Sequence, residues 1–338
     1  MVSAEKPLGM ASHPLTQALP ACRRFFSMFD DISAFLRSGL RDAAVYTAAG
    51  RVVTDLLLQA GSLAVDLAPE AGGSIAGFRV GEVDLLRPMS RTDRESGRGN
   101  NAAAYPLVPF SNRIANGRLD FEGETFHLKR NWPGVAHPMH GDGWSHAWHV
   151  AHADERFAEI VYEHDRAGTE GGWPFRYRAR QSYRVEPDRL IVGMAIENLE
   201  DRTVPAGLGL HPFFVRGHDV ELACRTQAVW KTDAEVLPVE RVPVPGDWDF
   251  REPRQIDDVV LDNCFDGWTG KAAVIWPRRL RLDLEASEPF RHVVIYVPAG
   301  QPYFCVEPVS HASGQVGLLP LAPRATRGGE IVFRISDL

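Results

Sequence analysis

The sequence predicts an all-β protein, built as one large antiparallel β-sandwich. Three observations favour this class. Apolar residues recur at a period of two, turn signals follow one another at short intervals, and no long amphipathic helix is predicted after residue 57. Many short strands with polar turns are typical of antiparallel sandwiches. Since residues 57–338 contain no repeat, low-complexity tract or linker, we expect them to form one domain.

Residues 1–56 have a different pattern, and we predict a poorly ordered N-terminal extension there. Arg23 and Arg24 precede the apolar run 25–29, but Asp30 follows at once, which disfavours both a secretory signal and a transit peptide. Apolar residues within 25–36 fall at helical spacing and allow a short amphipathic helix. An upstream extension, a docking helix and a start codon placed too early all remain open.

Individual strands can be predicted from the alternation. Residues 280–285 alternate leucine with charged residues, which indicates a strand with one solvated face. In residues 190–196, large apolar side chains alternate with smaller or polar ones, which indicates another strand. The run 292–297 is apolar on both faces, so we expect an interior strand. Gly72-Gly73 and Asn116-Gly117 are examples of the turn signals.

Composition limits the classes of partner. Hydrophobic residues make up 44% of the 338 residues, and the net charge of −7 argues against a nucleic acid or an anionic membrane. No apolar run approaches the length of a membrane span. We therefore expect a cytoplasmic protein, monomeric or weakly dimeric, that acts on a small molecule. The four cysteines lack a C-x-x-C pair and should be reduced, mostly buried thiols: Cys22, Cys224, Cys264 and Cys305.

The stretch 206–215 surrounds His211 with two glycines, a proline and two phenylalanines. Gly207 and Gly209 carry no Cβ, so backbone and substrate could come close there. The phenylalanines could wall a pocket and exclude water. An imidazole near its pKa in such a site is a useful proton donor. The alternative is a core histidine at a strand end.

A second polar motif lies within residues 105–114. Arg113 offers a rigid fork of donors, and Asn112 offers both a donor and an acceptor, which suits adjacent hydroxyl groups. A turn with an exposed arginine explains this stretch equally well.

Residues 137–149 contain four histidines in two H-x-x-H pairs, which raises a zinc hypothesis. Against it, the region has no helical pattern, and no nearby cysteine or carboxylate completes a ligand set. We predict instead a tight loop in which Trp144 and Trp148 offer apolar platforms for a sugar. His140 is then a pocket donor, and metal binding stays a minor alternative. The remaining histidines are expected at the surface or behind the pocket wall: His137, His146 and His149.

Two carboxylates stand in apolar surroundings. Asp262 follows an apolar strand, where a carboxylate is costly unless something binds it, as a polyol would. An Asx turn or an ion pair is the alternative, and it suits Asp266 better. Glu307 is embedded in an apolar strand, where desolvation would raise its pKa and make it a stronger base. A structural salt bridge explains Glu307 as well as catalysis does.

In this order, from residue 63 to the C-terminus, these stretches resemble the aldose 1-epimerase (galactose mutarotase) family. The motifs that carry the resemblance are residues 81–88, 112–114, His140-Gly141 with Trp144, 205–214, 261–268 and 304–308. The chain departs from the family in its first fifty-odd residues. It departs again at residues 324–330, which replace a compact turn and leave the register of the last strand open.

The resemblance implies a galactose mutarotase-like β-supersandwich that binds an aldohexose and needs neither cofactor nor metal. It implies that Glu307 is the general base, His211 the general acid and His140 a second active-site histidine. Asn112, Arg113 and Asp262 match ligands of sugar hydroxyl groups. The expected activity is interconversion of the α and β anomers of a free aldohexose.

Three rival functions remain open. A hexose-phosphate epimerase would need further basic side chains at the site, such as Arg79 or Arg216. A non-catalytic sugar-binding domain would need neither a matched acid nor a matched base. A glycoside-cleaving enzyme would need two facing carboxylates, for which Asp262 and Glu307 could serve, but His211 would then have no task. The preferred sugar is not predicted, since epimer choice depends on one or two hydroxyl contacts.

Overall fold

The structure, a computed structural model, describes residues 44–46, 52–54, 56–165, 170–314 and 318–337. All of these lie in the unit Ala43–Leu338. Strand β1 (Ala44–Tyr46) pairs antiparallel with β2 (Val52–Thr54), inside the stretch that we assigned to the N-terminal extension. The predicted helix within 25–36 lies outside the described residues. The division between residues 56 and 57 stays a prediction.

Within the described residues, most strands belong to two large antiparallel sheets, which confirms the predicted all-β class. The nine-stranded sheet runs in the order β10 (His149–Ala153), β11 (Phe157–His164), β12 (Tyr177–Glu186), β13 (Arg189–Asn198), β26 (Thr326–Asp337), β22 (Leu280–Ala286), β21 (Lys271–Trp276), β16 (Glu221–Cys224) and β19 (Phe250–Gln255). The eleven-stranded sheet runs in the order β18 (Pro238–Pro243), β17 (Ala228–Thr232), β20 (Leu261–Asp266), β23 (His292–Val297), β24 (Tyr303–Val309), β15 (Gly209–Val215), β7 (Ala104–Leu107), β5 (Ser74–Val80), β4 (Leu63–Ala68) and β3 (Leu56–Ala60), with β6 (Val83–Asp84) on β5.

The remaining elements are short. Two further strand pairs are β8 (Arg118–Phe121) with β9 (Glu124–His127) and β14 (Val204–Ala206) with β25 (Leu319–Leu321). The helices of the described part are α2 (Arg91–Glu95) and the 3-10 turns η2 (Gly99–Asn101), η3 (Ala115–Gly117), η4 (Gly143–Ser145) and η5 (Gly246–Trp248). None of the helices described is long and apolar enough to cross a membrane.

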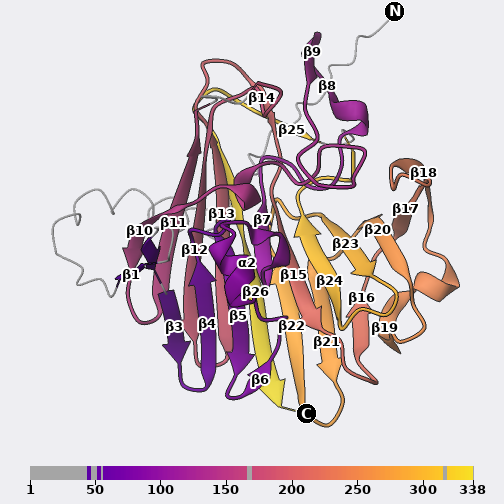
Figure 1. Cartoon of the computed structure of the whole chain (residues 1–338). Coiled ribbons are helices and arrows are strands. Elements are labelled where there is room, and N and C mark those ends of the chain that lie inside the picture. Colours follow the sequence, from indigo (N-terminus) through magenta and orange to yellow (C-terminus); the bar gives the residue numbers. More distant parts are fainter. Residues whose placement is uncertain (1–43, 47–51, 55, 166–169, 315–317, 338) are drawn as a thin grey trace, which may run out of the picture. The chain divides into compact units, whose positions relative to one another are not determined.

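The two large sheets pack face to face, with β3, β4 and β5 in front of β11, β12 and β13 in Figure 1. Aromatic side chains from both sheets meet between them. The rings of Phe78 and Phe333 lie 5.9 Å apart, and Phe214 contacts both Phe304 and Phe333. These side chains are fully buried, and burial of so much apolar area is the main force that holds a sandwich together.

The predicted strands are confirmed. The alternating runs form β22 and β13, where the side chains of Leu280, Leu282 and Leu284 are buried. The doubly apolar run 292–297 forms β23, an interior strand between β20 and β24. The register of the last strand is regular, because β26 pairs with β13 along residues 326–334 and with β22 along residues 331–337.

The alternation of side chains along each strand also determines which of them lie on the outer face of the eleven-stranded sheet. On β24, Phe304 and Val306 point into the core between the sheets, so Cys305 and Glu307 point outward. On β15, Leu210 and Phe214 belong to the same core, which leaves His211 facing outward. Adjacent strands thus present their polar side chains on one surface.

Candidate active site

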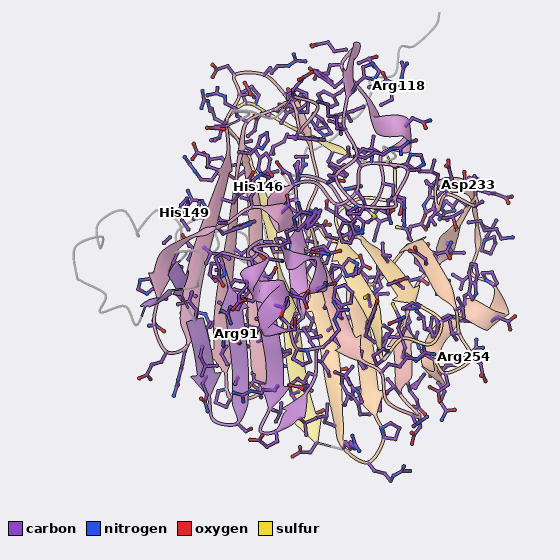
Figure 2. The ribbon with its side chains drawn as sticks, in the orientation of Figure 1. Arg91, Arg118, His146, His149, Asp233 and Arg254 are labelled. Atoms are coloured by element: carbon purple, nitrogen blue, oxygen red, sulfur yellow. The ribbon has the colours of Figure 1, made fainter. Side chains whose placement is uncertain are left out.

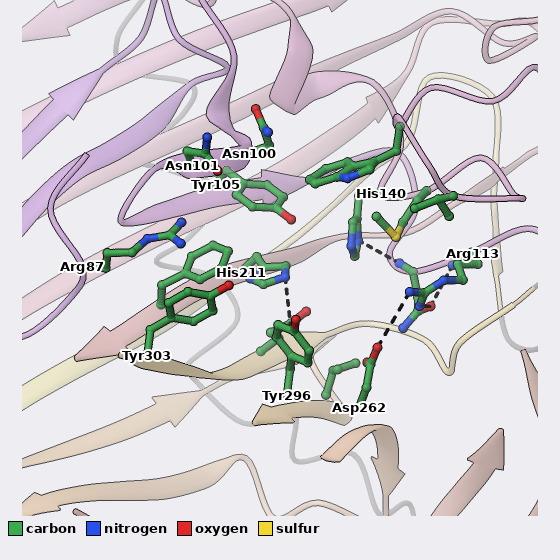
Figure 3. A pocket seen from close by; sticks show the side chains of 17 residues that line it. Arg87, Asn100, Asn101, Tyr105, Arg113, His140, His211, Asp262, Tyr296 and Tyr303 are labelled. Atoms are coloured by element: carbon green, nitrogen blue, oxygen red, sulfur yellow. Dashed lines mark hydrogen bonds and ion pairs between the residues drawn. The ribbon is translucent and has the colours of Figure 1, made fainter. Parts of the chain in front are cut away.

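A cavity of about 290 Å³ lies on the outer face of the eleven-stranded sheet (Figure 3). Its size is at the lower end of the usual range for small-molecule sites, about 300–1,000 Å³, which favours a small ligand. All six residues that the sequence singled out line this one cavity: Asn112, Arg113, His140, His211, Asp262 and Glu307.

His211 and Glu307 face each other at the base of the cavity. The His211 Nε2 lies 3.3 Å from the Glu307 Oε1, and the two side chains are only 8% and 2% exposed. They converge because β15 and β24 are hydrogen-bonded neighbours, on which outward positions alternate with core positions. A titratable pair at this distance can share or exchange a proton.

The His211 imidazole packs against two aromatic rings. Tyr105 on β7 lies directly across from His211, and their ring centroids are 4.7 Å apart. Phe213, two residues further along β15, also stacks on the imidazole, with ring centroids 4.5 Å apart. This removal from water, with a smaller contribution from the positive charge of Arg87, lowers the pKa of His211 to about 3. The expectation of an imidazole near its ordinary pKa was therefore wrong, because the His211 side chain is buried.

Burial acts on Glu307 in the opposite direction. It raises the pKa of the Glu307 carboxyl well above its ordinary value, as we predicted. The negative charge of Asp262 raises it further, whereas the positive charge of Arg113 opposes the rise. A single proton held by the pair is therefore favoured on Glu307, which leaves both groups neutral.

His140 lines the same cavity as a neutral hydrogen-bond donor. Its Nδ1 accepts a hydrogen bond from the backbone N–H of Asn112 at 3.1 Å, so its Nε2 carries the proton. Burial, with the charges of His211 and Arg113, lowers the pKa of His140 well below its ordinary value. His140 has a positive φ of 63°, and Gly141 follows with φ 67°. A Cβ on Gly141 would lie 2.0 Å from the Val108 carbonyl oxygen, so this turn requires glycine.

Arg113 and Asp262 also line the cavity, on the same side of His211 as His140 in Figure 3. The Asn112 Oδ1 accepts hydrogen bonds from the Arg113 backbone N–H at 2.9 Å and from its Nη1 at 3.1 Å. This fixes the guanidinium, whose Nη2 lies 3.7 Å from the Asp262 Oδ2. Burial raises the pKa of Asp262, and Arg113 opposes the rise. The wall offers donors and an acceptor close together, which suits neighbouring hydroxyl groups.

The other histidines of the 137–149 stretch stay away from the cavity. His146 and His149 are exposed (both labelled in Figure 2), as expected. His137 is buried, and its Nδ1 accepts a hydrogen bond from the Asn116 backbone N–H at 3.1 Å. No group of three metal-ligating side chains forms among the described residues of this stretch. In the described part of the chain, the one such group is His211, Cys305 and Glu307, at the base of the cavity.

Two predictions about the apolar wall were wrong. Trp144 and Trp148 are buried and do not line the cavity, and Trp132 lines it instead, with its ring 4.7 Å from that of Trp144. The reason is the tight loop itself. The Trp144 and Trp148 indole N–H groups donate to the Gly141 and Gly143 carbonyls, which turns both rings inward.

The roles expected for the residues around His211 were right only in part. Phe213 lines the cavity, whereas Phe214 points into the core between the sheets. Gly207 and Gly209 do not line the cavity. They admit buried neighbours instead, since a Cβ on Gly207 would lie 2.4 Å from the His311 ring.

Several lining residues escaped the sequence analysis. Tyr303 could have been found by counting two positions at a time back from Glu307 along β24. Tyr296 could have been found only with the register, which pairs it with Asp262. Trp132 and Arg87 belong to no strand, so no periodicity indicates them.

A buried polar network anchors the loop that carries His140. The Asp142 Oδ2 lies 2.7 Å from the His164 Nδ1, and the Tyr177 hydroxyl donates to the other Asp142 oxygen. Burial lowers the pKa of His164, but the hydrogen bond and charge of Asp142 outweigh this effect, so the net shift is upward. The Asp142 backbone N–H also donates to the Val108 carbonyl at 3.1 Å. The loop is thereby tied to both large sheets.

Comparison with known proteins identifies the family. The sequence profile of the aldose 1-epimerase family matches residues 55–324. The chain belongs to the aldose 1-epimerase family. It is 31% identical over 302 residues to the uncharacterised protein YphB of Escherichia coli K12, which spans 85% of this chain and 100% of the relative.

Solved structures of the aldose 1-epimerase family share the fold. A candidate aldose 1-epimerase from Escherichia coli K12 superposes with a TM-score of 0.77 at 29% identity, over 85% of this chain and 100% of that one. The galactose 1-epimerase from Lactobacillus acidophilus NCFM has a TM-score of 0.73 at 14% identity, over 87% of this chain and 98% of that one. At that identity the likeness shows the fold alone. The galactose mutarotase-like fold expected from the sequence is thus confirmed.

Proposed function

We propose that this protein is a cofactor-independent aldose 1-epimerase (mutarotase), which interconverts the α and β anomers of a free aldose. The observation that carries the proposal is the buried pair of His211 and Glu307, 3.3 Å apart in a cavity lined with hydroxyl-binding groups. Opening a cyclic hemiacetal needs a base at the anomeric hydroxyl and an acid at the ring oxygen. Both oxygens are bonded to C1, so the acid and the base must lie close together.

Ring opening moves two protons. Glu307, as the carboxylate, takes the proton of the anomeric hydroxyl, while His211, as the imidazolium, gives its proton to the ring oxygen. The C1=O bond forms and the bond between C1 and the ring oxygen breaks. This step needs the proton of the pair on His211. We infer that sugar hydroxyl groups which donate to the Glu307 carboxylate stabilise this arrangement against the cost of burial.

Ring closure reverses the roles of the pair. The open-chain aldehyde rotates about C1–C2, so that the ring oxygen attacks the other face of the carbonyl. Neutral His211 takes the proton of the attacking hydroxyl, and protonated Glu307 returns its proton to the carbonyl oxygen. The pair ends as it began, and only protons have moved. Each positioned proton transfer contributes about 10²–10⁴-fold to the rate.

The geometry supports this proposal better than two of its rivals. A glycoside-cleaving enzyme would use Asp262 and Glu307 as a facing pair, but Asp262 is paired with Arg113 and Glu307 with His211. A sugar-binding domain without catalysis has no use for an acid and a base that face each other in a buried cavity.

The test is the optical rotation of freshly dissolved α-D-glucose and α-D-galactose. We expect the protein to accelerate the approach to equilibrium above the buffer-catalysed rate, with the final rotation unchanged. If the protein accelerates no free aldose, while titration calorimetry shows that it binds sugars, the binding-domain alternative replaces the proposal.

Replacing Asp262 by Asn is expected to weaken substrate binding more than turnover. The substitution removes a charged acceptor and leaves Arg113 without its partner. Because a hydrogen bond to a charged group contributes about 1.5–3 kcal/mol, we expect KM to rise about 10- to 100-fold. The matched control is Asp266→Asn on the same strand. Asp266 is paired with Arg241 outside the cavity, so KM should stay unchanged. A KM at the wild-type level for Asp262→Asn would remove Asp262 from the binding site.

The pH dependence follows from the two shifted pKa values. The active pair holds one proton, so activity falls when both groups are protonated or when neither is. Because the pKa of His211 is lowered to about 3 and that of Glu307 is raised well above its ordinary value, we expect kcat/KM to be flat from above about pH 3 up to the range in which Glu307 loses its proton. The alkaline limb marks the loss of the Glu307 proton. After subtraction of the buffer-catalysed rate, a loss of kcat/KM as the pH falls through about 6.5, the ordinary histidine value, would contradict this prediction.

A further inference from the structure

Arg87 is a second cation on the wall of the cavity, to which neither the sequence analysis nor the proposed reaction gives a task. Its guanidinium carbon lies 4.0 Å above the centroid of the Phe213 ring and 4.6 Å from that of Tyr303. Its Nη2 donates to the Ala102 carbonyl oxygen at 3.1 Å. These contacts fix the plane and position of the guanidinium at one end of the cavity.

The charge of Arg87 is not balanced by the protein. Arg87 forms no ion pair within the described residues, and its buried Nε has no hydrogen-bond partner there. The carboxylates that line the cavity are Asp262, which is paired with Arg113, and Glu307, which faces His211. A buried guanidinium donor without an acceptor is costly, and an anionic ligand would supply the acceptor.

The position of Arg87 matches one part of a pyranose. In the sugar ring, C1 and C5 flank the ring oxygen, and C2 lies on the far side of C1. With His211 at the ring oxygen and Glu307 at C1, the ring carbons with free hydroxyls extend to one side and the C5 substituent to the other. In Figure 3, Arg113 and Asp262 lie on one side of His211 and Arg87 lies on the other. A sugar whose hydroxyls contact Arg113 and Asp262 therefore directs its C5 substituent toward Arg87.

We propose that Arg87 forms an anion subsite, and that the preferred substrates are aldoses whose C5 substituent is anionic, as a carboxylate or a phosphate. This inference rests on the proposed mutarotase function and names its substrate class. Asn100 lines the same cavity and offers an amide donor to such a group, whereas the Asn101 Nδ2 donates to the Asp93 Oδ1 at 2.7 Å. The two arginines named for the rival hexose-phosphate function, Arg79 and Arg216, do not line the cavity. Arg79 is exposed, and Arg216 donates to the backbone carbonyls of Pro298, Ile256 and Asp257.

The experiment compares D-glucose, D-glucuronate and D-glucose 6-phosphate as substrates of the wild-type protein and of Arg87→Met. Methionine keeps an apolar chain over Phe213 and Tyr303 but removes the charge. We expect the wild type to prefer at least one anionic sugar, and Arg87→Met to lower kcat/KM for that sugar about 10- to 100-fold more than for glucose. The two anionic sugars distinguish a carboxylate subsite from a phosphate subsite. Arg79→Met, at an exposed arginine, is the matched control and should leave all three values unchanged.

Two results would overturn the subsite while leaving the mutarotase function intact. One is a wild type that turns over glucose at least as well as both anionic sugars. The other is an equal loss of kcat/KM on all three sugars in Arg87→Met, which would show that Arg87 supports the structure around Phe213. If no sugar is turned over, the mutarotase function fails and calorimetry decides the subsite. Tighter binding of an anionic sugar than of glucose, lost in Arg87→Met, would support the subsite, and equal binding would refute it.

Discussion

Replacing Glu307 by Gln is expected to lower kcat for anomer interconversion by about 10²–10⁴-fold, because the variant retains no base at the anomeric hydroxyl. The fold should persist. Burial already favours the neutral form of Glu307, and glutamine is a neutral side chain of the same shape. The sugar should still bind, since Asn112, Arg113 and Asp262 are untouched. Optical rotation measures the rate, and titration calorimetry measures the binding.

The matched control for this variant is Glu159→Gln on β11. Glu159 is also a buried glutamate, only 5% exposed and 3.7 Å from Arg180, but it lies on the other sheet. It should keep wild-type kcat even if its stability changes. An active Glu307→Gln variant would exclude Glu307 as the base and with it the proposed proton path.

Replacing His211 by Asn is expected to have an effect of similar size on kcat, about 10²–10⁴-fold, because the ring oxygen loses its proton donor. The low pKa of His211, about 3, also leads to a prediction for the double variant. A neutral imidazole can act as an acid only after it takes the proton of Glu307. The double variant with Glu307→Gln should therefore be no slower than the slower single variant, since the two residues act as one unit.

His152→Asn is the control for histidine loss, because the His152 side chain is 53% exposed and lies on β10. Its kcat should equal that of the wild type. Additive losses in the double variant, with each single variant still well above the buffer-catalysed rate, would show that His211 and Glu307 act independently. The account of a shared proton would then be wrong.

Much of the fold could be predicted because the strands alternate strictly. The same period of two that marks residues 280–285 as a strand also fixes which of its side chains are buried. Pairing between distant strands could not be predicted in this way. Nothing local indicates that β13 and β22 both flank β26, since those contacts depend on the packing of whole sheets.

The candidate site could likewise be predicted only in part. The candidates for acid and base, His211 and Glu307, were found because a histidine and a glutamate stand out in apolar strands. The residues that surround this pair were not predicted. Tyr105 reaches His211 through cross-strand pairing, and Arg87 reaches the cavity from an irregular segment next to Phe214. The pKa of His211 was also misjudged, because the rings that exclude water from it come from two different strands.

The most direct test of the central claim is magnetisation exchange between the α and β anomeric protons of an aldose at equilibrium, observed by NMR. Exchange at equilibrium reports ring opening and closing without any change in composition. The wild type should produce exchange cross-peaks, with glucose or with an anionic aldose, that Glu307→Gln and His211→Asn do not produce at equal sugar saturation. Absence of exchange with the wild type for every aldose that it binds would contradict the claim that His211 and Glu307 form a catalytic pair.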